Sequence, residues 1–381
     1  MQIAFTIYHI QRYGGQQRHL HRFVEELLRR GHHCRVYAAS SEWGALEDVD
    51  MRHVPVRAMR QHRFEQRFHA WVTQDLLNDP VDCVIGFNKM PGLDFYFCYD
   101  SCYLDTVMRE RSALYRRSAR YAHYVSWERA VFAPPSQTQL LMHSSRTAQV
   151  FVQNYGTEAS RIQILPPGAS REHAPGSNAP DRRKTAREAL SLDSRDLALL
   201  FIASSFQDKG LERVLQAQAQ MRKQQPNAET RLLVVGSDNP QPYRRLAKRL
   251  GILDAVSFLG PREDVPDLLQ AADVMVHPAV SDAQGSVLLE SLVAGLPVLT
   301  TSASGYADHI AAANAGIVLR DPFSLREMTD GLMRFVDGVF RAQCAERSLR
   351  YAADNDLYSM YVVGTDFLLA TLQDKLGNYG R

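Results

Sequence analysis

The stretch Val280-Ser-Asp-Ala-Gln-Gly-Ser-Val-Leu-Leu-Glu290-Ser-Leu-Val-Ala-Gly-Leu-Pro297 decides how the chain folds. The apolar run 272–278 that precedes it ends in a proline and predicts a buried strand. Apolar residues recur at helical spacing over 287–293, and Gly-Leu-Pro follows, which predicts a helix and its end. The stretch is therefore predicted to be a loop that carries Asp282, followed by a helix that carries Glu290 about one turn inside.

A helix start of this kind can bind a diphosphate. Its first N–H groups have no partner within the helix, and a glycine such as Gly285 lets an anion approach the backbone closely. The carboxylates of Asp282 and Glu290 can accept hydrogen bonds from sugar hydroxyls. Taken alone, the two carboxylates are better explained as a surface aspartate and a helix-face glutamate, but the strand–loop–helix context favours a ligand site.

Length and composition limit the possible classes of protein. A chain of 381 residues suggests two or three domains, and 45% hydrophobic with 23% charged residues is a globular profile. The net charge of +2 gives no overall electrostatic attraction to nucleic acid. No run approaches the roughly 18 apolar residues of a membrane-spanning helix, and the start does not resemble a signal peptide. We therefore expect a soluble or peripheral protein.

The five cysteines are odd in number and lie mostly in apolar runs. This usage predicts reduced, buried thiols in a cytoplasmic protein. Their spacing does not fit a zinc site, so no metal site is predicted.

Strands and helices alternate along both halves of the chain. Strand 3–8, the pair Gly14-Gly15, helix 20–28 and strand 34–39 begin a doubly wound sheet. The glycines do not form G-x-G-x-x-G and no acidic residue closes the second strand, which disfavours a nicotinamide dinucleotide site. A second alternation follows residues 169–184, which are rich in Ala, Ser, Pro and Gly.

The predicted fold class is α/β, with two Rossmann-like doubly wound domains. Their predicted boundaries are residues 1–168 and 169–351, and a helical segment over 352–381 is expected to cross back to the first domain. Strands 81–87 and 95–100 would place Asp100 at the carboxyl edge of the first sheet, where ligands of open α/β sheets bind. The alternative is that Asp100 caps the following helix.

Residues 103–132 carry six arginines against three acidic residues, with tyrosines and a tryptophan between them. We predict one helix in which Arg109, Arg116 and Arg120 share a face. A basic, aromatic helix suits an anionic membrane surface, whereas the alternative is a solvated face with tyrosines packed inward. The predicted membrane-binding residues are Arg109, Arg116, Arg117, Arg120, Tyr121 and Trp127.

Several motifs together resemble one known family. They are Gly14-Gly-Gln-Gln-Arg18, Gly86-Phe-Asn-Lys-Met-Pro-Gly-Leu-Asp94, Leu165-Pro-Pro-Gly168, His277-Pro-Ala, and Asp282 with Glu290 after seven intervening residues. They resemble the lipopolysaccharide core glucosyltransferase I proteins, within the GT-B glycosyltransferases of family four. The resemblance implies two Rossmann-like domains with a cleft between them. It also implies retaining, metal-independent transfer of a hexose, expected to be glucose, from a UDP-sugar to a heptose or hexose of the core.

The resemblance also implies partners and residue roles. The partners are a nucleotide-sugar donor, a lipid-anchored glycan and an anionic membrane surface, at the cytoplasmic face of the inner membrane. Lys209 would neutralise the donor diphosphate, Glu290 would hold the ribose, and Asp282 would meet the donor sugar. Lys209, Asp282 and Asp100 form the expected catalytic set. The other expected donor-binding residues are Gly14, Gly15, Ser205, Arg262, Gly285, Ser286 and Val287. No cofactor is expected besides the UDP-sugar substrate.

Four positions depart from the family pattern. His19 and His173 stand where an aspartate and an arginine are expected, and Asp208 replaces an arginine before Lys209. Asp282 is one methylene shorter than the usual glutamate. These departures leave two alternatives open: a catalytically weakened relative that binds a membrane or an assembly, and a sugar-nucleotide epimerase with the same fold.

Overall fold

The computed structural model describes residues 1–11, 15–42 and 48–379. The chain divides into two compact units. The first contains residues 1–166 and 359–381, and the second contains residues 167–358. The chain therefore passes between the units twice, close to the predicted boundaries at Gly168 and Tyr351.

A parallel sheet of seven strands forms the centre of the first unit. Its order is β5 (Val49–His53), β3 (His33–Ala38), β1 (Gln2–Thr6), β6 (Cys83–Gly86), β7 (Phe95–Phe97), β8 (Gln139–Met142) and β9 (Ile162–Ile164). A separate pair joins β2 (His9–Ile10) to β4 (Ser40–Ser41). The strand order reverses between β1 and β6, which makes this a topological switch point.

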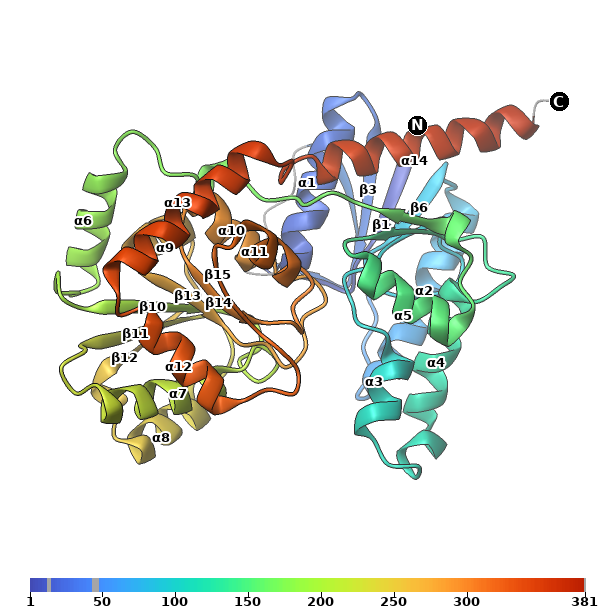
Figure 1. The fold of residues 1–381 in the computed structure, drawn as a ribbon. Coiled ribbons are helices and arrows are strands. Elements are labelled where there is room, and N and C mark those ends of the chain that lie inside the picture. Colours follow the sequence, from blue (N-terminus) through green and yellow to red (C-terminus); the bar gives the residue numbers. More distant parts are fainter. Residues whose placement is uncertain (12–14, 43–47, 380–381) are drawn as a thin grey trace. The chain divides into compact units, whose positions relative to one another are not determined.

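Helices cover both faces of this sheet (Figure 1). On one face, α1 (Gly15–Arg29) and α14 (Met360–Tyr379) share a core with the sheet that contains Phe23 and Leu368. A Cβ at Gly364 would lie 2.8 Å from the Phe23 ring, so glycine permits this close helix packing. The other face carries α2 (Gln61–Asn78), α4 (Ala119–Phe132) and α5 (Ser145–Tyr155) around a second core that contains Phe132 and Phe151. Helix α3 (Tyr103–Glu110) precedes α4.

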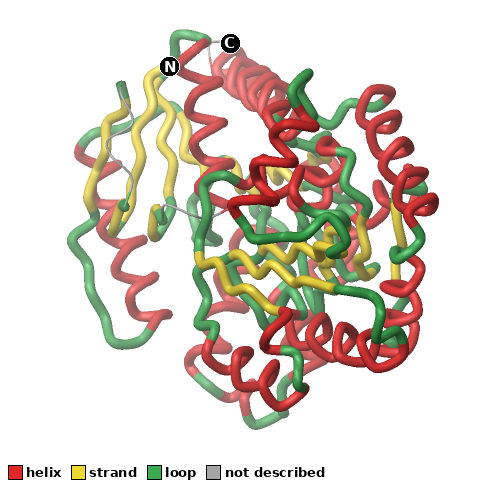
Figure 2. Tube along the Cα trace, turned by 90° about the vertical axis from the view of Figure 1, so that its left-hand side faces the viewer, coloured by secondary structure: helices red, strands yellow, loops and turns green. Residues whose placement is uncertain are grey.

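The second unit has a parallel sheet of six strands. Its order is β12 (Val256–Gly260), β11 (Thr230–Val235), β10 (Leu197–Ile202), β13 (Val274–His277), β14 (Val298–Thr301) and β15 (Gly316–Leu319). Here the order reverses between β10 and β13. Figure 2 shows the strands of the sheets, in yellow, between layers of helices, in red. The predicted α/β class with two Rossmann-like doubly wound sheets is confirmed.

Two helical layers also enclose the second sheet. One core lies under α7 (Leu211–Gln224), α8 (Gln241–Leu250) and α12 (Leu325–Arg334). The other lies under α9 (Val265–Ala271), α10 (Ser286–Ala294), α11 (Ala307–Ala313) and α13 (Gly338–Asp354). Helix α6 (Ala179–Ala189) packs against α9.

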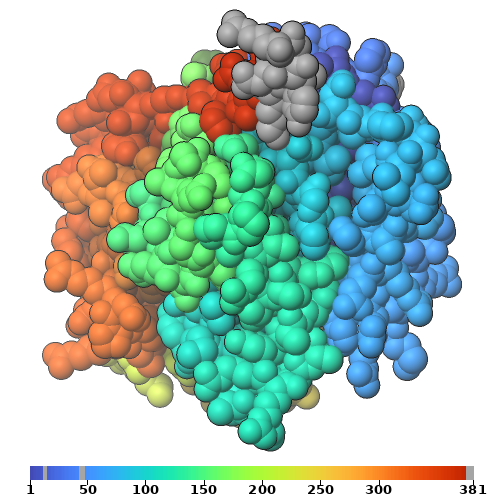
Figure 3. Space-filling model, turned by 90° about the vertical axis from the view of Figure 1, so that its right-hand side faces the viewer, coloured from blue at the N-terminus to red at the C-terminus, as the bar shows by residue number. Residues whose placement is uncertain are grey.

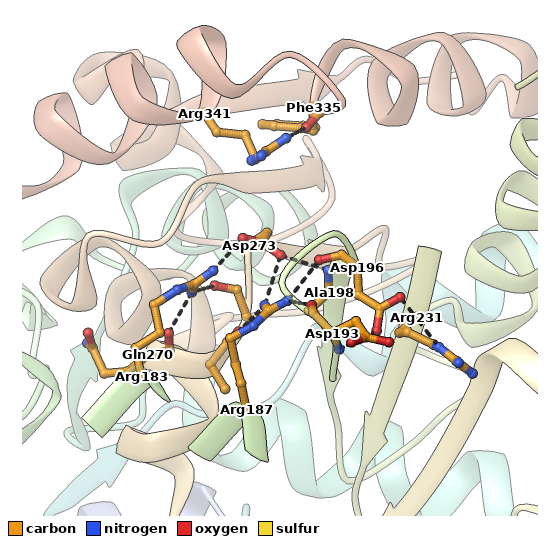
Figure 4. A network of polar contacts seen from close by, with 12 residues as sticks. Arg183, Arg187, Asp193, Asp196, Ala198, Arg231, Gln270, Asp273, Phe335 and Arg341 are labelled. Carbon is orange, nitrogen blue, oxygen red and sulfur yellow. Dashed lines mark hydrogen bonds and ion pairs between the residues drawn. The ribbon is translucent and has the colours of Figure 1, made fainter. Parts of the chain in front are cut away.

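A polar network fastens α6 to the amino ends of β10 and β13 (Figure 4). The buried guanidinium of Arg187 donates to the carbonyl of Ala271 at 3.0 Å and to Asp273 at 3.3 Å. Asp273 also accepts the N–H of Ala198 at 2.8 Å and pairs with Arg183 at 2.7 Å. This end of the sheet is opposite the carboxyl edge, so the network stabilises the unit without contacting a site at that edge.

The prediction of one helix over residues 103–132 is wrong. Helix α3 ends at Glu110, a short 3-10 turn covers Tyr115–Arg117, and α4 begins only at Ala119. Ser118 has extended backbone, and its hydroxyl accepts the N–H of Tyr121 at 3.1 Å, which makes it the N-cap of a new helix. Arg109, Arg116 and Arg120 therefore lie on three different elements and do not share a helix face.

Candidate active site

The loops that follow β10 and β13 meet at the carboxyl edge of the second sheet. These two strands are neighbours, and the strand order reverses between them. The carbonyl of Asp208 accepts the N–H groups of Val280 and Ser281 at 2.8 and 3.2 Å, which ties the two loops together. Such a switch point is where open α/β sheets bind ligands. Lys209 and Asp282 are thereby brought into contact.

The Asp282 carboxylate has a partner on each oxygen. Its Oδ1 lies 2.9 Å from Nζ of Lys209, and its Oδ2 lies 2.7 Å from Nε2 of His277. The Asp282 side chain is only 8% exposed. Burial alone would raise the pKa of Asp282, but the hydrogen bonds and charges of His277 and Lys209 outweigh it and hold the pKa well below its usual range. Asp282 is therefore an ionised carboxylate at neutral pH.

Helix α10 begins beside this carboxylate. Its N-cap, Gly285, has φ +77°, and a Cβ there would lie 3.3 Å from Oδ2 of Asp282 and 3.3 Å from Cβ of Ser304. Glycine is thus favoured both by the left-handed backbone and by the close neighbours. The N–H groups of Ser286 and Val287 belong to the first turn, where the helix itself offers no acceptor.

Glu290 lies one turn inside α10 and is 5% exposed. The predicted helix and the position of Glu290 within it agree with the structure. Its role toward a ribose stays a prediction.

Ser205 and Arg262 each form a hydrogen bond with a carboxylate of the same chain. The hydroxyl of Ser205 donates to the Asp208 carboxylate at 2.8 Å, so the departure at 208 places an exposed acidic group in the Lys209 loop. Nε of Arg262 donates to Asp264 at 2.7 Å, and the guanidinium makes a second contact with the same carboxylate. Because β12, which precedes Arg262, is two strands away from β10, the sheet order does not bring Arg262 to Lys209.

In the first unit, Gly15 and Asp100 lie at the carboxyl edge of the sheet, while Gly14 is outside the described residues. The hydroxyl of Tyr99 lies against Gly15 and leaves no room for a Cβ there. The side chain of Asp100 is 45% exposed, accepts the hydroxyl of Tyr96 at 3.1 Å and lies 4.0 Å from Nζ of Lys89. Asp100 is not the N-cap of the following helix, the alternative role considered for it, because the N-cap of α3 is Cys102.

The two histidines that depart from the family pattern are both buried. Nδ1 of His19 is 2.9 Å from the hydroxyl of Tyr361 on α14, so it helps to attach that helix to α1. His173 lies in a 3-10 turn of the second unit, with Nδ1 3.2 Å from the carbonyl of Ser170. The neighbouring Arg171 stacks on the ring of Tyr358 at 3.9 Å.

His143 follows β8, and neither of its buried ring nitrogens has a partner among the described residues. Its ring packs against Phe97 at 4.7 Å and His19 at 5.8 Å between centroids. Burial, with a smaller effect of His19, lowers the pKa of His143 well below its usual value. The unfolded state therefore binds the proton first as the pH falls below about 6.5, and folding loses stability there.

We expect His143→Leu to raise the free energy of unfolding by about 1–3 kcal/mol at pH 7, because an unpaired buried polar group is removed. The difference between variant and wild type should grow below pH 6.5. Urea denaturation between pH 5 and pH 8 measures both. If the free energies of unfolding of the two proteins change in parallel with pH, other imidazoles cause the acid sensitivity.

Glu128 on α4 is fully buried and forms the base of a hairpin made by residues 103–132, called here the basic hairpin. It accepts hydrogen bonds from Nζ of Lys89 at 2.7 Å and from the hydroxyl of Tyr155 at 2.6 Å. It also accepts the N–H groups of Tyr103 and Leu104 at 2.8 and 3.0 Å, which caps α3. Burial opposes its ionisation, but the Lys89 ammonium outweighs burial and lowers the pKa of Glu128.

The basic hairpin exposes two apolar side chains, Met108 at 55% and Leu114 at 76%. Figure 3 shows the hairpin, in blue-green, as a continuous outward-facing surface at the bottom of the view. Trp127 instead packs between His123 and His69, at 4.4 and 5.5 Å between centroids. The exposed large apolar side chains of the basic hairpin are thus Met108 and Leu114 rather than Trp127.

The arginines predicted to bind a membrane are distributed over the hairpin. Arg109 pairs with Asp105 at 3.2 Å, and both are on α3. Arg116 lies 3.1 Å from the sulfur of Met108, and the Arg120 guanidinium is 5.7 Å from the ring centre of Tyr124. The remaining two residues of that set are Arg117, which is exposed, and Tyr121, which lies 6.4 Å from the ring of Tyr103.

Two further features concern membranes and metals. In the part of the chain that the structure describes, no helix has both the length and the apolar character needed to cross a bilayer. Within the same residues, no cluster of three or more His, Cys, Asp or Glu side chains could hold a metal ion. The cysteines at 34, 83, 98, 102 and 344 are buried free thiols.

Comparison with known proteins gives consistent results for both units. Residues 13–173 match "Glycosyltransferase Family 4", and residues 182–349 match "Glycosyl transferases group 1". The chain is 38% identical to lipopolysaccharide glucosyltransferase WaaG of Escherichia coli K12 over 98% of its own length and 100% of that protein's.

Solved structures agree with this comparison. A crystal structure of WaaG superposes with a TM-score of 0.93 at 38% identity, over 96% of this chain and 99% of that one. Sucrose-phosphate synthase of Thermosynechococcus elongatus superposes with a TM-score of 0.79 at 15% identity, over 98% and 99% of the two chains. The second likeness shows a shared fold alone.

Proposed function

Because the chain belongs to the glycosyltransferase family of WaaG, with the GT-B fold, we propose that it moves glucose from UDP-glucose to the lipopolysaccharide core. The acceptor in this proposal is a heptose or hexose, and transfer proceeds with retention and without a metal ion. The observation that carries the proposal is the contact of Lys209 with an ionised Asp282 beside the start of α10.

The chemistry follows from charge. As the bond between the anomeric carbon and the diphosphate breaks, negative charge grows on the leaving group and positive charge on the sugar. The Lys209 ammonium and the N–H groups of Ser286 and Val287 stabilise the negative charge on the leaving group. This preorganised electrostatic effect supplies the charge that a metal would otherwise bring. The Asp282 carboxylate stabilises the positive charge on the sugar. Glu290 is assigned to the ribose.

A donor panel tests this function. We would incubate the protein with UDP- and GDP-sugars and purified core acceptor and measure nucleotide release and product formation. UDP release that depends on both glucose donor and acceptor supports the proposal, and the anomeric configuration of the product tests retention. Undiminished rates in the presence of a chelator would support metal independence, whereas a chelator-sensitive rate would contradict it.

The exposed carboxylate of Asp208 in the Lys209 loop favours one alternative, a relative with weakened catalysis. In that case no donor would give acceptor-dependent release, while the protein would still bind membranes. The same incubation also tests the other alternative, because an epimerase would interconvert the donor sugar without needing acceptor.

We also propose that the basic hairpin attaches the protein to an anionic membrane, at the cytoplasmic face of the inner membrane, where a lipid-anchored acceptor would be available. The excess of three positive charges would contribute about 3 kcal/mol at about 1 kcal/mol each. The exposed Met108 and Leu114 would add apolar contact at the tip.

Changing Arg109, Arg116 and Arg120 to Ser is expected to weaken binding to anionic vesicles by up to about a hundredfold. Raising salt from 0.1 to 1 M should weaken wild-type binding as well, since the Debye length falls from about 10 to 3 Å. Co-sedimentation with vesicles of varied anionic lipid content measures both effects.

The matched control changes three exposed cations on α8, namely Arg245, Lys248 and Arg249, to Ser. This variant has the same loss of charge in the other unit. If both triple variants lose binding equally, net charge is responsible, and the basic hairpin is an ordinary solvated surface.

A further inference from the structure

We propose that His277 is a positioning residue of the donor site, which holds the Asp282 carboxylate away from the start of α10 and thereby keeps that start open for a diphosphate. The inference rests on the proposed function, because it names how the same site is kept ready for its donor. The sequence did not single out His277 beyond its place in a motif, His277-Pro-Ala at the end of a strand.

His277 is held rigidly. It is the last residue of β13 and is 2% exposed. Its carbonyl accepts the hydroxyl of Thr300 and the N–H of Ala279, both at 2.9 Å. Its ring stacks on Phe201, with an angle of 27° between the planes. A side chain fixed in this way gives its ring nitrogen a defined direction.

The direction of the hydrogen bond follows from the charge of Asp282. An ionised carboxylate can only accept hydrogen bonds, so the ring nitrogen of His277 that faces it must carry a proton. The N–H at Nε2 of His277 therefore donates to Oδ2 of Asp282 at 2.7 Å. Nδ1 of His277 is buried and has no partner among the described residues, so Asp282 is the partner that orients the ring.

Without this hydrogen bond, the carboxylate has a competing partner nearby. The N–H of Gln284 already points to Oδ1 of Asp282 at 3.4 Å, and Gly285 lies close to Oδ2. An aspartate next to a helix start readily accepts its free N–H groups, as N-cap aspartates do. Those are the groups assigned to the diphosphate. Released from His277, Asp282 would occupy the anion site itself and carry the Lys209 ammonium with it.

The test compares three variants. His277→Phe keeps an aromatic ring on Phe201 but loses the N–H, and His277→Gln keeps an N–H that can reach the carboxylate. His309→Phe is the matched control, because His309 is a partly buried histidine of the same unit whose Nδ1 is 2.9 Å from the hydroxyl of Tyr351 on α13. Each protein is examined for UDP affinity by calorimetry, for steady-state transfer from UDP-glucose, and for thermal unfolding.

We expect His277→Phe to weaken UDP binding and to lower kcat by on the order of ten- to a hundredfold, the range for loss of a hydrogen bond to a charged group. The KM of the acceptor should stay unchanged. His277→Gln should restore both parameters to within about threefold of wild type, and His309→Phe should leave them unchanged.

Three outcomes would overturn the inference: wild-type UDP affinity in His277→Phe, equal impairment in the Phe and Gln variants, or a wild-type protein that binds no UDP. If the wild-type protein binds UDP but transfers no glucose, the proposed function is wrong. The UDP affinities of the variants would then still decide the role of His277.

Discussion

Replacing Lys209 by Ala is expected to lower turnover by on the order of 10²–10³, since one preorganised partner of the leaving group is lost. The ammonium contacts Oδ1 of Asp282 and the carbonyl of Ser281 at 2.9 and 3.3 Å, and its side chain is still 20% exposed. The ammonium can thus reach a phosphate of the donor while it remains paired with Asp282. Its loss also leaves the buried Asp282 with one strong partner instead of two.

Single-turnover and steady-state rates with UDP-glucose measure this effect. Glu290→Ala should reduce turnover to a similar degree, because it removes the group assigned to the ribose. Lys248→Ala, an exposed lysine on α8, is the control for loss of a positive charge from the same unit. Wild-type rates in Lys209→Ala, together with an unchanged melting temperature, would remove the donor-site assignment.

The second large effect concerns stability. We expect Glu128→Ala to reduce the free energy of unfolding of the first unit by about 3–5 kcal/mol, the cost of breaking a buried ion pair from one side. The change leaves the Lys89 ammonium without its strongest partner and removes the acceptor for the first N–H groups of α3.

Urea denaturation measures this loss of stability, and a double variant supplies the control. Combining Lys89→Met with Glu128→Gln removes both charges and should recover a large part of the loss, because no uncompensated charge then remains buried. A loss below about 1 kcal/mol in Glu128→Ala would mean that the first unit relaxes and admits water to Lys89.

Some features of the fold and site followed from the sequence because they depend on local patterns. The alternation of apolar strands and helices indicated two doubly wound sheets, and the parallel topology then brought Lys209 to Asp282 at the reversal of strand order. The glycine at 285 was predictable for the same reason, since a helix start beside a ligand requires close approach.

Other features depend on contacts between distant residues. The sequence did not show that Trp127 packs against His69 and His123, because helical spacing does not reveal which face is covered. The break before α4 depended on a single capping serine, Ser118, within an otherwise helical composition. The sequence alone also did not show that Arg262, predicted to bind the donor, pairs with an aspartate two residues later.

The division of the first unit between both ends of the chain has a consequence for its synthesis. Leu20 and Phe23 of α1 belong to the same core as Leu368 and Leu372 of α14. At about 5–20 residues per second, a ribosome needs roughly 10 to 40 s to make the roughly 190 residues of the second unit that lie between these segments. During that time the nascent first unit presents an uncovered apolar face, while the second unit, which is continuous in sequence, completes its own core. The unit translated first is therefore the last to finish folding. Its uncovered apolar face is the surface that we expect a chaperone to bind during synthesis.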